Sequence, residues 1–484
     1  MSITNIVKRL QDIMRQDAGI NGDAQRIEQI VWMLFLKVYD AREEFWEFYD
    51  DDYESIIPEE CRWRNWAVDN KDGNALTGEE LLDFVNNTLF PALKGIEIDE
   101  YTERKSSIVK EVFEDTHNFM KDGVLLRQVV NAIDEVDFTD YDERHTFNDI
   151  YENLLKDLQS AGNAGEYYTP RALTDFITEM LQPKVIDKVA DFACGTGGFL
   201  TSYLNYLSNN NMVKTPEEKE EINKNICGVE KKPLPHLLCI TNMLLHDIDE
   251  PNIIHGNSLE KNVRDYNEED KFDIIMMNPP YGGTEIDSIK VNFPASMQTS
   301  ETADLFMTLI LYRLKENGKC GVVLPDGFLF GNDNAKTAIK EKLLRECNLH
   351  TIVRLPNGVF APYTDINTNV LFFEKGTPTK EVWYYEHQLP EGYKKYTKTK
   401  PIRLSEFEVE KEWWNNRKEN EYAWKVSIEE IKDSDYNLDF KNPYIKEEEL
   451  DDPKVLLEKY HKSKEEVLKI QNALIDELRK ILEV

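Results

Sequence analysis

The stretch with the clearest chemical potential is Asn278-Pro279-Pro280-Tyr281, which directly follows the apolar run 272–277. A β-favouring run that ends in two prolines predicts a buried strand that stops abruptly. Because proline has no N–H, the carbonyls of Asn278 and Pro279 are not consumed by a continuing strand ladder and can face a ligand. Open α/β sheets bind their ligands at this carboxyl end of their strands. An amide acceptor, a free carbonyl and an aromatic ring together suit a planar molecule with an exocyclic amine.

A glycine-rich turn is the second candidate. Residues 189–200 are expected to form a strand, a tight turn and a helix start, and the residues of interest are Asp191, Ala193, Gly195, Thr196, Gly197 and Gly198. Glycines let a ligand approach the backbone, and a helix start offers free N–H groups, although such turns also need glycine for geometry alone. Glu230 ends the next strand-like run, where a carboxylate suits the two hydroxyls of a ribose. Asn257 ends a third run and can hydrogen-bond an adenine edge, or serve only its own turn.

Two nucleotide-binding motifs are missing from the sequence, and their absence narrows the possible cofactors. The chain has neither a GxGxxG fingerprint nor a P-loop lysine, which disfavours nicotinamide cofactors and nucleoside triphosphates. A further candidate segment precedes a helical stripe and consists of Glu166, Tyr167, Tyr168, Thr169, Pro170 and Arg171. We expect Thr169 or a neighbour to cap that helix, with Pro170 in its first turn. Capping does not explain the paired tyrosines.

Composition limits what the whole protein can do. Its 484 residues, 41% hydrophobic and 31% charged, predict a folded protein of two or three domains. A net charge of −33 disfavours a protein that grips DNA alone, because DNA affinity depends largely on neutralising phosphates. If DNA is the substrate, a local basic strip or a partner must hold it. The acidic residues between 40 and 60 are expected to form a solvated face.

Other functional classes receive no support. The start of the chain contains no apolar segment long enough for export or for a membrane span, so we expect a cytoplasmic protein without a membrane partner. The six cysteines form no CxxC pair, and the eight histidines show no HExxH spacing. We therefore expect reduced core cysteines and no metal site.

Four segments are expected to position these residues. Residues 1–145 carry amphipathic helical stripes and predict a helical N-terminal domain that contacts partners or DNA, while 146–380 alternate strands and helices as in an open, mainly parallel sheet. Residues 381–450 form a mixed extension that contains a basic strip, residues 393–403, with two tyrosines and no acid. Its candidates for binding phosphate, for which a solvated hairpin is the alternative, are Lys394, Lys395, Lys398 and Lys400. Residues 451–484 show heptad-like spacing and predict a helix that docks on partner helices.

In this order, the motifs resemble those of the modification subunits of type I restriction-modification systems, which are N6-adenine DNA methyltransferases. The resemblance spans nearly the whole chain and rests on GEYYTPR, DFACGTGGFL, GVE, HGNSL, NPPYGG, ADLFMTLILYRLKENGKCGVVLPDGFLF and LPNGVFAPYTDINTNVLFFEKG. It implies an α/β fold, the Rossmann-like sheet of S-adenosylmethionine-dependent methyltransferases, with an all-α N-terminal domain before it and a helical tail after it. The implied partners are DNA, a specificity subunit, a second modification subunit and, in some complexes, a restriction subunit.

The resemblance also implies roles for single residues. The 166–171 segment would flank the methionine end of the cofactor, and Asp191 with the glycine turn would line it. Glu230 would bind the ribose and Asn257 the adenine; many relatives have Asp at that position, but the amide oxygen can also accept the adenine amine. Phe360 would cover the second face of the target base, with core packing as the alternative.

The expected reaction follows from the residue types. The lone pair of adenine N6 is delocalised, so the amine needs acceptors for its protons, and the Asn278 oxygen and the Pro279 carbonyl can serve. Tyr281 would stack on the base once it is flipped out of the duplex. No covalent intermediate is expected, and Cys194 is then a packing residue. The alternatives are methylation of cytosine N4, an RNA base or a protein glutamine, and an inactive subunit that only binds the cofactor.

Overall fold

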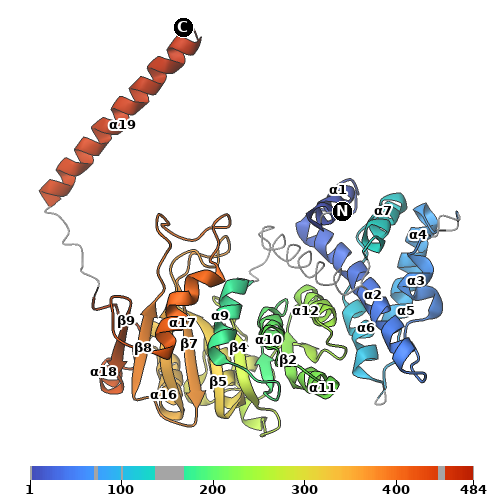
Figure 1. Ribbon diagram of the computed structural model, residues 1–484, viewed down its shortest axis with the longest axis horizontal. Coiled ribbons are helices and arrows are strands. Elements are labelled where there is room, and N and C mark those ends of the chain that lie inside the picture. Colours follow the sequence, from blue (N-terminus) through green and yellow to red (C-terminus); the bar gives the residue numbers. More distant parts are fainter. Residues whose placement is uncertain are drawn as a thin grey trace. The chain divides into compact units, whose positions relative to one another are not determined.

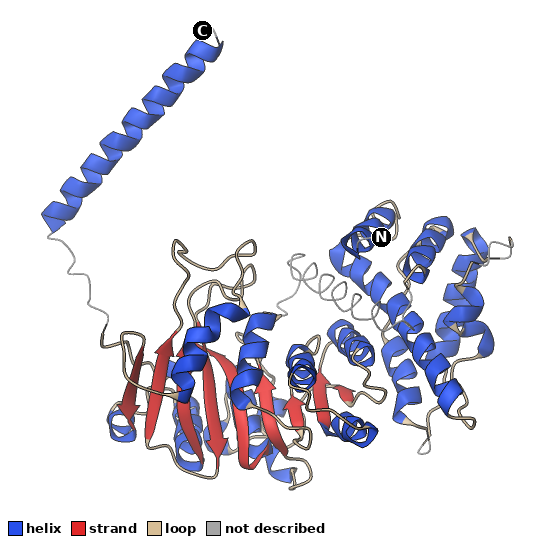
Figure 2. Ribbon diagram, viewed as in Figure 1, coloured by secondary structure: helices blue, strands red, loops and turns tan. Residues whose placement is uncertain are grey.

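The computed structural model describes residues 3–69, 73, 75–99, 102–136, 168–444 and 453–482. Residues 1–440 form one compact unit, and residues 441–484 form a second. The first unit contains a helical part and a sheet part, and both are drawn in Figures 1 and 2.

The described part of the first 136 residues is helical, as expected. Its helices are α1 (Ile3–Met14), α2 (Asp23–Tyr49), α3 (Trp63–Trp66), α4 (Gly78–Phe84), α5 (Phe90–Lys94), α6 (Arg104–Glu114) and α7 (Gly123–Asp134), with short turns at Glu59–Cys61 and Val85–Leu89. Most of α2 between residues 27 and 39 is buried on all sides, and the rings of Trp32 and Phe35 pack edge-on against Phe113 of α6. Helix α2 is therefore the centre of this part of the core.

The expectation of a solvated acidic face between residues 40 and 60 is only partly correct. Asp40 and Glu43 are buried on α2. The Arg64 guanidinium donates to Asp40 at 2.9 Å, and the Tyr53 hydroxyl donates to Glu43 at 2.9 Å. A count of charges could not reveal these partners, because they come from other segments of the chain.

The described residues of the second half build one nine-stranded sheet in the order β3-β2-β1-β4-β5-β7-β6-β8-β9. Its strands are β1 (Val189–Asp191), β2 (Ile226–Glu230), β3 (Ile253–His255), β4 (Phe272–Met277), β5 (Leu314–Pro325), β6 (Cys347–Arg354), β7 (Thr368–Lys375), β8 (Glu381–Glu386) and β9 (Ala423–Ser427). The first five strands in this order are parallel, β7 runs antiparallel between β5 and β6, and β8 is parallel to β6. The predicted α/β class and mainly parallel sheet are thus confirmed.

Both faces of the sheet are covered by helices, which explains why strands such as β4 and β7 are buried through most of their length. In β4, Ile274 and Met276 join one core cluster, whereas Ile275 and Met277 join the other. The first cluster includes side chains of α9 (Arg171–Leu181), α10 (Gly198–Asn209) and α12 (Pro233–Leu245), and the second those of α14 (Thr302–Arg313) and α16 (Asn334–Glu346). The six cysteines are buried and unpaired, as expected.

The remaining elements complete the fold. They are α11 (Pro216–Asn225), α13 (Asp287–Lys290), α15 (Asp326–Phe330), α17 (Glu408–Asn415), α18 (Ile428–Asp433) and short turns at Val263–Asp265, Ala295–Met297 and Leu404–Phe407. Strands β8 and β9 lie in the segment predicted as an extension, 381–450, yet they pair into the same sheet as β6. Arg42 of α2 joins the helical part to the loop after α12 through Asp247, at 2.6 Å, and Asp249.

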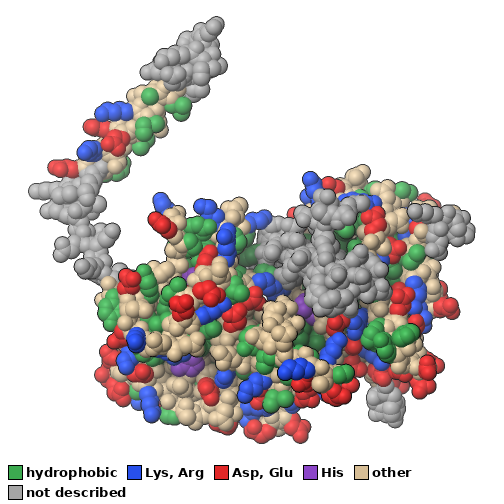
Figure 3. Space-filling model, in the orientation of Figure 1, with side chains coloured by type: hydrophobic (Ala, Val, Ile, Leu, Met, Phe, Trp, Pro, Cys, Tyr) green, Lys and Arg blue, Asp and Glu red, His purple; other side chains and the backbone are tan. Residues whose placement is uncertain are grey.

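The second unit contains α19 (Pro453–Leu482), in the segment where a helix was predicted. In its described middle, Leu457, Tyr460, Val467 and Leu474 are exposed. Figure 3 shows hydrophobic side chains between Lys and Glu along this helix. Among the described residues, no helix is both long and apolar enough to cross a membrane.

Candidate active site

The candidate residues meet at one edge of the sheet because the strands that carry them are parallel. Asp191 ends β1, Glu230 ends β2, and Asn278 follows the last residue of β4. Ala190 pairs with Ile275 across β1 and β4, so these two strands end side by side. The Asn278 segment and the glycine turn therefore lie next to each other, as the sequence predicts.

Asn278 is nearly buried, and both ends of its amide have partners. Its Nδ2 donates to the Thr169 hydroxyl at 3.0 Å, and its Oδ1 accepts from the Tyr281 hydroxyl through a short hydrogen bond. Thr169 does not cap α9: the N-cap position is Pro170, without a side-chain hydrogen bond. Of the residues expected at the cap, the neighbour Pro170 takes the N-cap position and not the first turn, and the Thr169 hydroxyl accepts from Asn278. This contact links the 168–171 segment to the end of β4.

Tyr281 and Phe360 form one wall of the site. Both rings are buried, with 7% and 2% of their surface exposed, and their centroids lie 6.4 Å apart with planes at 86°. This edge-to-face packing leaves no slot between parallel rings for a planar base. A base that stacks on Tyr281 must therefore turn or displace one of the two rings, and its amine must replace the tyrosine hydroxyl on Asn278.

The glycine turn joins two strand ends through one carboxylate. The Gly195 N–H donates to Glu230 Oε2 at 2.9 Å, and the Lys232 N–H donates to Glu230 Oε1 at 2.8 Å. Gly195 has a φ of 54°, and a Cβ there would meet nothing within 4 Å, so this residue borders open space. Gly197 has a φ of 82°, and a Cβ there would come within 2.9 Å of the Cys239 sulfur. Thus Gly195 leaves room for a ligand, whereas Gly197 permits close packing on α12.

Asp191 is buried beneath this turn. Burial raises the pKa of its carboxyl to about 8; the N–H of Ala193 opposes the increase, and the Glu230 carboxylate adds to it. The Glu230 carboxylate and the Asp191 carboxyl beside an open glycine turn favour a ligand that brings positive charge and hydroxyl donors. S-adenosylmethionine has both, a sulfonium and an ammonium group on one side and ribose hydroxyls on the other, so these residues fit it.

The other cofactor candidates lie around the same edge. Asn257 Oδ1 accepts from the Leu259 N–H at 3.1 Å, so an adenine amine would have to share this oxygen with the turn. Arg171 lies over the Tyr168 ring at 5.0 Å, and a Cβ at Gly198 would come within 2.3 Å of its guanidinium. Glu166 and Tyr167, and the predicted boundaries at 145 and 450, lie outside the described residues.

One supporting residue was not anticipated. Asn242 of α12 is 2% exposed, and its Nδ2 donates to the carbonyl of Thr196 at 3.0 Å. It thereby holds the glycine turn from behind. The signal for it was an amide in the run 237–245, which is apolar apart from this residue and Thr241, because a buried amide needs a hydrogen-bond partner.

Most of the basic strip is exposed, but Tyr396 is fully buried, Ile402 is buried, and Tyr393 and Thr397 are half-buried. Lys395 pairs with Asp365 at 3.1 Å, and Lys400 lies over the Tyr393 ring at 4.8 Å. Lys394 and Lys398 are exposed. Contacts of Lys395 and Lys400 thus hold the strip in place, and its exposed lysines provide positive charge at the surface.

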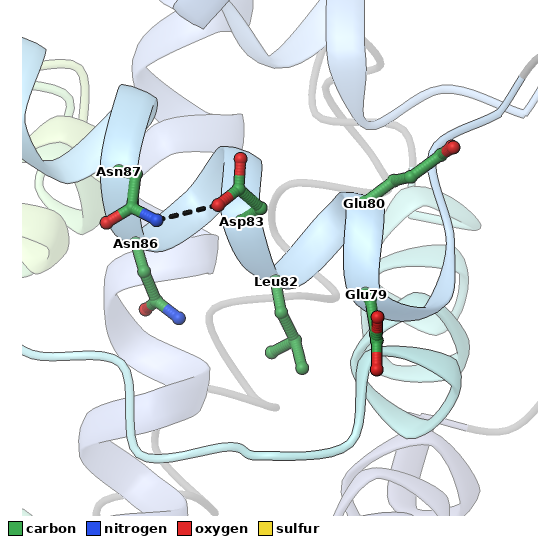
Figure 4. Close-up of a pocket in the computed structure, with 6 residues that line it drawn as sticks. All are labelled: Glu79, Glu80, Leu82, Asp83, Asn86 and Asn87. Atoms are coloured by element: carbon green, nitrogen blue, oxygen red, sulfur yellow. Dashed lines mark hydrogen bonds between the residues drawn. The ribbon is translucent and has the colours of Figure 1, made fainter.

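An open recess on α4 offers different chemistry. Its lining residues, shown in Figure 4, are Glu79, Glu80, Leu82, Asp83, Asn86 and Asn87. The Asn87 amide donates to Asp83 at 2.7 Å. Three carboxylates repel phosphate, and none of the candidate site residues contributes to this recess, so it has no role in the site described above.

Comparison with known proteins places this arrangement in a family. Residues 142–452 match the N-6 DNA Methylase family, and residues 3–133 match the HsdM N-terminal domain. The chain is 52% identical to the EcoEI type I restriction enzyme methylase subunit of Escherichia coli, over 98% of this chain and 97% of that protein. It is 30% identical to the StySPI methylase subunit of Salmonella potsdam, over 89% of this chain and 80% of that protein.

Two solved structures agree with this assignment. One is a modification subunit assigned to a type I restriction enzyme of Vibrio vulnificus, with a TM-score of 0.82 and 41% identity over 92% of this chain and 97% of that one. The other comes from work on the assembly of a type I restriction-modification system, with a TM-score of 0.82 and 36% identity over 99% and 98%. The chain belongs to the N-6 DNA methylase family and, within it, to the methylase subunits of type I restriction enzymes.

Proposed function

We propose that this chain transfers a methyl group from S-adenosylmethionine to N6 of an adenine in DNA, as the catalytic subunit of a type I restriction-modification complex. The observation that carries the proposal is the Asn278 amide, held by Thr169 at the end of β4 beside an open glycine turn at the end of β1. This arrangement brings an acceptor for an exocyclic amine next to a glycine turn that suits the methyl donor.

The residues at the end of β4 act on the amine. Asn278 Oδ1 and the Pro279 carbonyl accept its two hydrogens, which frees the nitrogen lone pair to attack in line. S-adenosylmethionine, when bound, supplies the methyl group on a positively charged sulfur. Tyr281 releases Asn278 and stacks on the flipped base, and Phe360 covers the opposite side. The spare proton leaves to water, because no described side chain at this position is a strong base.

Separate residues hold the methyl donor and the DNA. Asp191 and Gly195 line the donor site, Glu230 accepts from the ribose hydroxyls and Asn257 lies toward the adenine. Tyr168, Thr169, Pro170 and Arg171, together with Glu166 and Tyr167, are assigned to its methionine end, and Ala193, Thr196, Gly197 and Gly198 to the turn. Lys394, Lys395, Lys398 and Lys400 are assigned to DNA phosphates.

Partners complete the enzyme. The net charge of −33 favours a complex in which a specificity subunit holds the DNA. A second copy of this chain and, in the full complex, a restriction subunit are the other partners, and α19 with its exposed apolar side chains is suited to docking on helices of the specificity subunit. A DNA substrate agrees with the cytoplasmic location expected from the sequence.

Methyl transfer with the Asn278→Ala variant tests the proposal. We expect transfer of tritiated methyl groups to DNA, by the complex with its specificity subunit, to fall by about 10²–10³-fold while cofactor binding persists, since one acceptor of the reacting group is lost. Asn225→Ala, which removes a buried amide from α11, is the control.

Activity that survived Asn278→Ala would remove the catalytic assignment. Label found in protein or RNA, and never in DNA, would refute the DNA substrate. Analysis of the methylated nucleosides separates adenine N6 from cytosine N4.

A further inference from the structure

Four polar side chains that have no role in the reaction above form a cluster beneath the basic strip. His387 follows β8, Tyr396 belongs to the strip, Glu406 precedes α17, and Glu410 lies in α17; all but Glu406 are at most 3% exposed. His387 Nε2 lies 3.1 Å from the Tyr396 hydroxyl, which donates to Glu406 Oε2 at 2.6 Å. His387 Nδ1 forms a short hydrogen bond with Glu410 Oε1.

The direction of the two hydrogen bonds at the Tyr396 hydroxyl follows from counting donors. A carboxylate only accepts, so the single proton of the Tyr396 hydroxyl is used on Glu406. His387 Nε2 must then donate to the tyrosine oxygen, and its Nδ1 shares a short hydrogen bond with Glu410. Such a chain of charge-assisted hydrogen bonds depends on every member, and Tyr396 is its central link.

The backbone of Tyr396 is in turn fitted onto the turn that carries Phe360. The Tyr396 N–H donates to the carbonyl of Asn357 at 3.1 Å. Gly358 has a φ of 84°, and a Cβ there would come within 2.2 Å of the Tyr396 carbonyl oxygen, so only glycine permits this approach. Phe360 is two residues further on and contacts Tyr281. Displacement of Tyr396 must therefore disturb the wall of the base site.

The same cluster is fastened to the helix that begins at the active site. The Phe407 ring lies 4.5 Å from His387 and stacks on Phe176 of α9 at 4.2 Å, with the planes 11° apart. The Lys411 ammonium of α17 forms a short ion pair with Glu179, also on α9. Contacts with α9 thus hold the cluster in place, and the cluster in turn supports the basic strip and the turn that carries Phe360.

We propose that Tyr396 is a positioning residue for DNA, held by His387 and Glu406 so that the basic strip and the Phe360 turn are presented together to a flipped base. This inference rests on the proposed function, because that function assigns Phe360 and the strip lysines to DNA. It implies that the buried cluster acts on the DNA side of the reaction and not on the methyl donor.

The test uses the Tyr396→Phe variant in the complete complex with the specificity subunit. It removes one hydroxyl and keeps the buried ring. We expect the KM for DNA to rise by about tenfold, the cost of one hydrogen bond to a charged partner, and the fluorescence increase of 2-aminopurine at the target position to fall. The Kd for S-adenosylmethionine should stay the same. The matched control is Tyr384→Phe, which removes a buried hydroxyl that donates to the Leu438 carbonyl at 3.0 Å.

A second variant, which leaves Tyr396 itself unchanged, separates the loss of the hydrogen bond from misfolding caused by the first substitution. Glu406→Ala lies at a half-buried position and leaves the Tyr396 hydroxyl without its acceptor, so it should raise the KM for DNA in the same way. The inference is overturned if both variants behave like Tyr384→Phe, or if they weaken cofactor binding as much as DNA-dependent steps. The proposed function fails separately, if the wild-type complex does not methylate DNA.

Discussion

The buried carboxyl of Asp191 gives the sharpest prediction. Its pKa is raised to about 8 from an ordinary 3.8, chiefly by burial. The folded protein therefore keeps this proton to a higher pH than the unfolded chain does. The contribution of Asp191 to the free energy of unfolding must therefore fall as the pH rises from about 4 to about 8. Replacing Asp191 with Asn removes the titrating group and keeps an oxygen that can accept from the Ala193 N–H.

The magnitude follows from the two pKa values. A difference between about 8 and 3.8, at roughly 1.4 kcal/mol for each factor of ten, is worth about 6 kcal/mol above pH 8. Near neutral pH, roughly three quarters of it, about 4 kcal/mol, is already present. Asp191 lies in the compact unit of residues 1–440. With an entropy of unfolding of about 2 cal/mol/K per residue, about 1 kcal/mol moves the melting temperature of such a unit by roughly 1 °C, so we expect the variant to melt about 4 °C above the wild type near pH 7.

Thermal melts of the cofactor-free full chain between about pH 5.5 and about pH 8.5 measure this difference. The gap between the variant and the wild type should widen steadily with pH. The control Asp287→Asn makes the same substitution in a side chain that is 98% exposed, and so measures the effect of the substitution without burial. A gap for Asp191→Asn that stays constant across this range would refute the reasoning, because it would mean that the carboxyl does not titrate differently in the folded protein.

Two further predictions concern ligands. Glu230→Gln should raise the Kd for S-adenosylmethionine by about tenfold in isothermal titration calorimetry, because a ribose hydroxyl loses a charged acceptor; an unchanged Kd would remove Glu230 from the donor site. Replacement of Lys394 or Lys398 by Ala should reduce the slope of log K against log salt by about 1 for each phosphate that is no longer neutralised, whereas Lys224→Ala on α11 should not change it. Equal slopes in all three variants would leave the basic strip without a role in binding phosphate.

Strand ends and the glycine turn were predictable because local patterns define them. The apolar run 272–277 coincides with β4, and the prolines after it do stop the strand. Parallel strands then bring Asp191, Glu230 and Asn278 to one edge without any further information. Gly195 and Gly197 both adopt a positive φ, as expected of glycines in such a turn.

Interactions between distant segments were not predictable from local patterns. Thr169 has the right neighbours for a helix cap, but Asn278, which lies 109 residues further along the chain, takes its hydroxyl. The hydroxyl of Tyr281 occupies the very oxygen expected to bind the amine, and only the side-chain torsions of the folded protein decide that. Likewise, the composition of residues 381–450 does not reveal that β8 finds its place beside β6.

The antiparallel strand β7 has a consequence for synthesis on the ribosome. Strands β5 and β6 leave the ribosome first, but the strand that must lie between them is finished only at Lys375. Until then, the nascent chain carries two open, apolar edges that can pair with other polypeptides. The glycine turn near residue 195 is therefore synthesised long before β7 is available to complete the sheet. We expect the catalytic half of this protein to fold late and to need protection by chaperones while it waits.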